Sequence, residues 1–172
     1  MLKWIHRMEE LDFNALMEIY AEACIENGQE FWPDLPAEEQ IRHSQEHFRS
    51  YLQEQFFAKP EAVYAVWLVE GRYVTALRLE PKWDGLLMEA LETRPDARCQ
   101  GHASALITAV QENFRTFPPI ASPTTKIYSH VRKTNLASLR THERCGFQRH
   151  KDHILRYDGT TSDQFYTMLW EG

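Results

Sequence analysis

The chain has 172 residues, which is enough for one domain with a sizeable core. Apolar residues make up 43% and charged residues 26%, so we expect a packed globular protein rather than a disordered one. A formal net charge of −6 disfavours nucleic acid as a partner. No apolar run approaches the roughly 18 residues of a membrane-spanning helix.

The three cysteines, Cys24, Cys99 and Cys145, are odd in number, widely spaced and without a CxxC pair. This usage favours reduced thiols over a disulfide framework or a zinc site. The first residues are not followed by an apolar segment and a cleavage site of small residues, so no signal peptide is expected. Together these features predict a cytoplasmic protein that spans no membrane.

The charge is spread unevenly along the chain. Residues 1–60 hold 12 acidic and 5 basic side chains, whereas residues 61–172 hold 13 acidic and 14 basic ones. An acidic N-terminal part suits a cationic substrate, and a near-neutral C-terminal part suits an anionic cofactor. The alternative is that the acids only solvate the outer faces of helices.

In the first third of the chain, a short alternation of apolar and polar residues predicts a strand. Apolar residues then recur at helical spacing after Asp12, a good N-cap, and Asn27-Gly28 is the expected end of that helix. A loop carrying Phe31 and Trp32 follows, and Pro36 suits the first turn of a second helix. The expected elements are a strand over Trp4–Met8 and helices over Phe13–Glu26 and Pro36–Tyr51.

In the middle of the chain the apolar residues change from helical spacing to the alternation and apolar runs that are typical of strands. Glu70-Gly71 and Asp84-Gly85 are turn signals between apolar runs, which predicts an antiparallel meander. After Pro95 the helical period returns, and Asn135 and Gly146 mark the start and end of a later helix. The expected elements are strands over Ala62–Val69, Arg72–Pro81, Leu86–Thr93, Lys126–Val131, Phe147–Tyr157 and Gln164–Trp170, and helices over Gly101–Phe117 and Asn135–Cys145.

This order predicts a single α/β (α+β) domain over residues 1–172. Its elements follow the order β-α-α-β-β-β-α-β-α-β-β, with a mixed central sheet of about seven strands and about four helices. No internal repeat or linker interrupts it.

The most informative local pattern is Arg98-Cys99-Gln100-Gly101-His102-Ala103, between a predicted strand and a predicted helix. The first N–H groups of a helix have no partner within it, and the helix dipole adds partial positive charge. Such a turn can bind a phosphate through main-chain donors. An ordinary tight turn into a helix is the alternative. The pattern is neither a P-loop nor a dinucleotide fingerprint, since the Gly-Lys-Ser/Thr and three-glycine spacings are absent.

With Arg98, Gly101 and Ala103 in the places of (Arg/Gln)-x-x-Gly-x-(Gly/Ala), the chain resembles the GNAT superfamily of acyl-CoA-dependent N-acyltransferases. An Asn-capped helix from Asn135 that ends in Gly146-Phe147 is similar to a later motif of the family. The resemblance extends along almost the whole chain through the order of its elements.

The resemblance implies a binding site for acetyl-CoA and no metal. Main-chain N–H groups of the turn would hold the pyrophosphate, with Arg98 at its start. Leu91 and Thr93 would pair with the pantetheine arm through the main chain, and Thr93 or its neighbour would polarise the thioester carbonyl. Asn135 would reach a pantetheine amide, cap its helix, or do both. The strands over 86–93 and 126–131 would splay apart around the arm. The turn residues in this role are Cys99, Gln100, Gly101, His102, Ala103 and Ser104.

Three residues are candidates for proton transfer. Glu89 and Glu92 lie where the family sometimes places a general base, and Glu89 is favoured because it is farther from the turn. Strict alternation would put these two on opposite faces, although family members commonly bulge here. His142 stands where the family often has a general-acid tyrosine, and its alternative role is to pack on the last helix.

The function predicted is acetyl transfer from acetyl-CoA to a primary amine by direct attack in a ternary complex. The amine is expected to be cationic and to belong to a small molecule or a peptide end, and the protein is a possible homodimer. The competing hypothesis is a non-catalytic acyl-CoA-binding or sensing module on the same fold. His43 and His47 could ligate a metal from one helix face, but no third ligand is evident and a solvated polar face is favoured.

Overall fold

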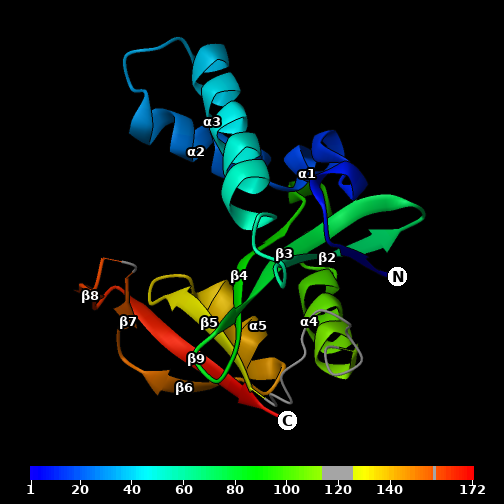
Figure 1. The fold of residues 1–172 in the computed structure, drawn as a ribbon, viewed down its shortest axis with the longest axis vertical. Coiled ribbons are helices and arrows are strands. Elements are labelled where there is room, and N and C mark those ends of the chain that lie inside the picture. The colour runs from blue at the N-terminus through cyan, green and yellow to red at the C-terminus, as the bar shows by residue number, and fades with distance from the viewer. Residues whose placement is uncertain (114–125, 157) are drawn as a thin grey trace.

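A seven-stranded mixed sheet forms the centre of the protein in the computed structural model, which describes residues 1–113, 126–156 and 158–172 (Figure 1). The strands lie in the order β1-β2-β3-β4-β5-β9-β6, and only β4 and β5 are parallel neighbours. The strands of this sheet are β1 (Leu2–Ile5), β2 (Val63–Val69), β3 (Arg72–Lys82), β4 (Gly85–Thr93), β5 (Lys126–Arg132), β6 (Gln148–Lys151) and β9 (Phe165–Glu171).

Within the described ranges, five α-helices cover the two faces of this sheet. The helices are α1 (Phe13–Ile19), α2 (Ala21–Phe31), α3 (Ala37–Tyr51), α4 (His102–Asn113) and α5 (Leu136–Arg144). Apolar side chains of α4 and α5 pack on one face in a cluster that includes Leu77, Met88 and Leu106. The first two helices and the π-helical turn Leu52–Phe56 that continues α3 pack on the other face. Figure 1 shows α2 and α3 side by side at one end of the molecule.

The predicted class, an α/β fold with a mixed seven-stranded sheet, is confirmed, and so is the antiparallel meander of β2, β3 and β4. The sequence predicted about four helices, and the difference lies in the first of them. None of the helices in the described ranges is long and apolar enough to cross a membrane.

The helix predicted over Phe13–Glu26 is wrong in both its continuity and its end. It breaks at Tyr20, which ends α1 and begins α2, and α2 then runs through Gly28 to Phe31. A Cβ atom at Gly28 would lie 2.8 Å from the carbonyl oxygen of Gln40 on α3. Gly28 therefore permits close approach of two helices, and the Asn27-Gly28 pair is not a helix stop.

Two other predicted elements also differ, and one predicted boundary is not tested. The first strand lies at Leu2–Ile5 instead of Trp4–Met8, because Met8–Glu10 forms a 3-10 turn. The strand predicted over Phe147–Tyr157 is two short strands, of which only β6 joins the main sheet. The other, β7 (Ile154–Leu155), pairs with β8 (Thr161–Ser162). The last part of the helix predicted to Phe117, residues 114–117, lies outside the described residues, as does residue 157.

Candidate active site

A β-bulge in β4 brings the two candidate glutamates to one face of the sheet. Glu89 lies opposite Arg78 on β3 and Glu92 lies opposite Ala76, so β4 has one more residue than β3 between these pairs. Ala90, in the bulge, has a φ of 52°, which is rare for a residue with a side chain. Its carbonyl oxygen accepts a hydrogen bond of 2.5 Å from the Tyr20 hydroxyl. Both carboxylates therefore project on the side of α1, α2 and α3.

Immediately beyond this point β4 and β5 separate. Their parallel pairing covers only Leu86–Met88 of β4, against residues 127–129 of β5. The main chain of β4 from the bulge to Thr93 is thus hydrogen-bonded to β3 on one side and has no strand partner on the other among the described residues. This opening has the place and direction that the sequence predicted for an extended ligand arm.

The opening leads into a cavity of about 550 Å³, here called the turn groove, beside the start of α4. Cys99 and Gly101 have φ values of 61° and 83°, and no atom lies within 4 Å of a Cβ placed on Gly101. Among the described residues no hydrogen-bond acceptor is recorded for the main-chain N–H groups of residues 99–104. These donors at the N-terminus of a 12-residue helix form a site suited to a phosphate or pyrophosphate.

The turn groove contains nine of the ten predicted cofactor-binding residues, and Gln100 is the exception. The nine are Leu91, Thr93, Arg98, Cys99, Gly101, His102, Ala103, Ser104 and Asn135. The side chain of Gln100 instead donates to the carbonyl oxygen of Asp96 at 3.4 Å.

Some side chains in the turn groove already have protein partners. Arg98 donates to Glu22 of α2 at 2.6 Å, and its Nη2 lies 3.9 Å from Oε2 of Glu92. Its positive charge therefore stabilises the ionised form of both carboxyl groups. The Thr93 and Thr75 hydroxyls are hydrogen-bonded to each other. Asn135 caps α5, since its side-chain oxygen accepts from the main-chain N–H of Ser138 at 3.0 Å. The cap predicted for Asn135 is therefore present, and the residue also lines the groove.

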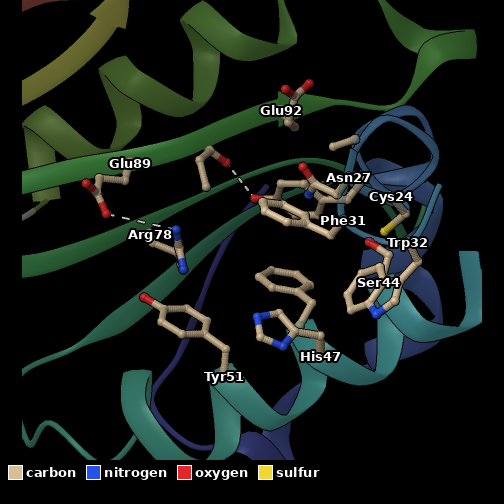
Figure 2. Close-up of a pocket in the computed structure, with 14 residues that line it drawn as sticks. Cys24, Asn27, Phe31, Trp32, Ser44, His47, Tyr51, Arg78, Glu89 and Glu92 are labelled. Atoms are coloured by element: carbon tan, nitrogen blue, oxygen red, sulfur yellow. Dashed lines mark hydrogen bonds and ion pairs between the residues drawn. The ribbon is translucent and has the colours of Figure 1, made fainter. Parts of the chain in front are cut away.

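A second cavity, of about 520 Å³, lies between β3–β4 and helices α2 and α3 and is here called the aromatic cleft (Figure 2). Six of its fourteen lining residues are aromatic, and its charged groups come from the sheet. The aromatic residues are Tyr20, Phe31, Trp32, His47, Phe48 and Tyr51, and the charged residues are Arg78, Glu89 and Glu92. Trp32 stacks on His43 with ring centroids 5.7 Å apart, so His43 and His47 support the aromatic wall.

Glu92 lines both cavities, which makes it the point where they meet. Burial raises its pKa, while the nearby Arg98 guanidinium opposes that shift. Burial also raises the pKa of Glu89, which lies at the other end of the cleft beside Arg78 (Figure 2). Each carboxyl group thus has an environment that favours proton uptake more than water does.

His142 lies in the core and lines neither cavity. One ring nitrogen contacts the carbonyl oxygen of Ser138 at 2.8 Å and the other contacts the Ser129 hydroxyl at 3.0 Å. A neutral imidazole that donates to Ser138 and accepts from Ser129 satisfies both contacts. Burial lowers the pKa of His142, which disfavours the imidazolium that a general acid would need. This geometry favours the alternative of a packing residue.

Several cavity residues were not identified from the sequence. In the turn groove these include Thr141 and Arg144 of α5, which line the same cavity as Asn135. Thr141 is three positions from Arg144, and this spacing of neighbours on a helix is the signal that could have indicated them. In the aromatic cleft the missed residues include Tyr20, Tyr51 and Arg78, which converge only through tertiary packing.

A mixed sheet that opens beside an N–H-rich helix start, with a second cavity at the opening, is the arrangement that the resemblance to the GNAT superfamily predicted. The family model described as Acetyltransferase (GNAT) family matches residues 14–147. The chain therefore belongs to the acetyltransferase (GNAT) family, and the resemblance predicted from its motifs is confirmed. No protein with a curated description matches the sequence.

Solved structures of the same fold include several acetyltransferases of low sequence identity. PaiA N-acetyltransferase from Thermoplasma acidophilum, in complex with coenzyme A, is 11% identical with a TM-score of 0.65 over 100% of this chain and 99% of its own. Aminoglycoside acetyltransferase AAC(6')-Ib, in complex with coenzyme A and kanamycin, is 15% identical with a TM-score of 0.63 over 99% and 93%. A chimera of the spermidine N-acetyltransferase SpeG from Vibrio cholerae and hSSAT is 15% identical with a TM-score of 0.57 over 99% and 95%.

Proposed function

We propose that this protein transfers an acetyl group from acetyl-CoA to the primary amine of a small molecule, by direct attack in a ternary complex. The observation that carries the proposal is that the turn groove and the aromatic cleft meet at Glu92. One cavity has the main-chain donors that a pyrophosphate requires, and the other has the size and apolar wall of a small-molecule site.

The described residues fit acetyl-CoA. Main-chain N–H groups of residues 99–104 would bind the pyrophosphate, with Arg144 on the facing helix adding positive charge. The main-chain groups of Leu91 and Thr93, on the unpaired side of β4, would bind the pantetheine arm as an added strand. Asn135 would reach a pantetheine amide from the opposite wall. When bound, acetyl-CoA supplies the thioester carbonyl carbon that the amine attacks.

Glu92 is the proposed proton acceptor for the attacking amine. A protonated amine has no lone pair, so it must lose a proton before the C–N bond can form and the C–S bond can break. Glu92 lies at the junction of the cavities, and burial raises its pKa toward the range that suits a general base. This assignment replaces Glu89, which the sequence favoured, because Glu89 lies at the far end of the cleft and lines only that cavity.

The acceptor is proposed to be cationic at its reacting nitrogen. Glu22 and Glu26 on α2 lie close enough to Glu92 to raise its pKa, and together they make the junction attractive to an ammonium group. His142 has no role in this scheme, and the departing thiolate takes its proton from water.

Release of coenzyme A thiol, followed with a panel of primary amines, tests the proposal. An N-acetylated amine, identified by mass and formed in equal amount to the thiol, is the expected product. Tight acetyl-CoA binding without amine-dependent thiol release would instead identify a sensing module on this fold.

A further inference from the structure

Arg78, on the floor of the aromatic cleft, is a nearly buried cation to which no anionic side chain of the described ranges is hydrogen-bonded. Its side chain is 16% exposed, and its Nε is fully buried with no hydrogen-bond partner among the described residues. The closest carboxylate oxygen, Oε2 of Glu89, lies 3.9 Å from its Nη2, which is beyond hydrogen-bond distance. Glu80, the next residue on the same face of β3, is bound instead by Lys59 at 2.5 Å.

The described residues around this guanidinium hold it in place without providing an acceptor for its Nε. It lies over the rings of Tyr51 and Phe56, with centroid distances of 5.0 and 5.6 Å. His130, on the far side of Glu89, adds no competing charge at neutral pH, since burial lowers its pKa to about 4. A guanidinium has five donors in a planar fork, and a buried donor such as the Nε–H of Arg78 is costly to leave without an acceptor.

The fork of an arginine matches the two oxygens of an oxyacid group. Arg78 lines a cavity of about 520 Å³, so a small ligand can supply such a group. At the opposite end of the cleft, Glu92 suits an ammonium group, and the walls between the two ends are aromatic. The cleft is therefore polar at both ends, with opposite signs, and apolar between them.

We propose that the acceptor is an amine that also carries an anionic oxyacid group, such as a carboxylate, on a compact apolar body, and that Arg78 binds this group. The inference rests on the proposed acetyl transfer and names the class of its acceptor. A linear polyamine fits poorly, because its second ammonium group would face the Arg78 guanidinium.

Matched pairs of amines test the specificity. Phenethylamine and phenylalanine differ by a carboxylate, as do propylamine and 4-aminobutyrate, and 3-aminopropylphosphonate supplies a phosphonate. The wild type should acetylate at least one anionic amine with a kcat/KM roughly tenfold or more above that of its matched amine. Arg78→Met should raise KM for that amine by roughly tenfold or more with a smaller change in kcat, and Arg78→Lys should recover part of the loss.

Arg49→Met is the matched control, since Arg49 also lies over an aromatic ring, that of Phe13 at 4.1 Å, but does not line the cleft. It should leave KM for every amine within about twofold of the wild-type value. A preference for the member of each pair that lacks the oxyacid group, or KM values that Arg78→Met leaves unchanged, would overturn the inference while the acetyl transfer stands.

Binding of 3-phenylpropionate, measured by calorimetry, separates the inference from the proposed function. This acid has no amine, so its binding needs no turnover. Loss of its binding in Arg78→Met but not in Arg49→Met supports the anion site even if no amine is acetylated. Equal affinity in all three proteins, or no binding to any of them, would reject the anion site.

Discussion

The turn groove and the aromatic cleft differ in how they are built. The turn groove presents main-chain donors from one continuous turn, residues 99–104, at the start of α4. The aromatic cleft presents side chains from α2, α3, β3 and β4, which lie far apart in the sequence. Main-chain chemistry suits a cosubstrate common to a family, whereas side chains can be replaced one at a time to suit a particular acceptor. The two cavities should therefore respond differently to substitution.

The largest effect is expected in the turn groove. Gly101→Trp should weaken acetyl-CoA binding by on the order of 3 kcal/mol, because the indole would occupy the space beside the main-chain donors. Calorimetric titration measures this loss. Gly71→Trp is a matched control, since Gly71 also has a positive φ, 79°, and open space around it, but lies in the β2–β3 turn. Wild-type affinity in a folded Gly101→Trp protein would be incompatible with the assigned pyrophosphate site.

The junction of the cavities should show the next largest effect. Glu92→Gln removes the proposed proton acceptor and should lower kcat at neutral pH by about 10²-fold, with little change in acetyl-CoA affinity. The deficit should shrink as pH rises, because more of the amine is then unprotonated in solution. Rate measurements across a pH series provide the test.

Glu89→Gln is the comparison for that experiment, since Glu89 lines only the cleft. It should change the acceptor KM more than kcat. If Glu89→Gln lowered kcat and Glu92→Gln did not, Glu89 would be the proton acceptor and Glu92 would not.

The bulge that places both glutamates on one face can be tested through Tyr20. Tyr20→Phe leaves the Ala90 carbonyl and the Tyr64 hydroxyl without their partner, which should lower the free energy of unfolding by about 1–3 kcal/mol. The acetylation rate should fall too, because Ala90 is held at a φ that few residues adopt.

Tyr64→Phe serves as its control, because it keeps the bond to Ala90 and removes only the 3.1 Å bond between the two hydroxyls. Denaturant unfolding and steady-state rates of both variants provide the readout. Equal losses in the two variants would mean that the Ala90 bond does not hold the bulge.

The smallest effect is expected on substitution of His142, which should change the free energy of unfolding and leave the acetylation rate nearly unchanged. The unfolded chain protonates this histidine as pH falls through about 6.5, whereas burial lowers its pKa in the fold. The unfolded state then binds more protons, so the free energy of unfolding falls as pH falls below about 6.5. His142→Gln should reduce that slope by at most about 1.4 kcal/mol per pH unit.

The rate of His142→Gln should stay within about threefold of wild type. Urea unfolding between pH 7 and pH 5, with rates on the same samples, covers both statements. A 10²-fold loss of rate with an unchanged stability slope would restore His142 as a general acid.

Local chemistry explains which features the sequence could predict. The strand meander follows from alternation and turn residues, and the turn groove from six consecutive residues at a helix start. The role of Gly28 was not predictable, because the atom that leaves no room for a side chain there is a carbonyl oxygen on another helix, 12 positions along the chain. The face of the sheet from which the Glu92 side chain projects was also undetermined. A bulge changes the alternation of side chains between the two faces, and it has no clear signature in the sequence. Arg78 lies in the middle of β3, and only packing shows that its Nε is buried without an acceptor among the described residues.

The central claim is that acetyl-CoA and an amine occupy the two cavities at once and react where these meet. Initial rates of thiol release, measured while both substrates are varied, test this most directly. Direct transfer predicts amine-dependent release and double-reciprocal lines that intersect. Parallel lines, which indicate an acyl group held first by the protein, or the absence of amine-dependent release, would contradict the account.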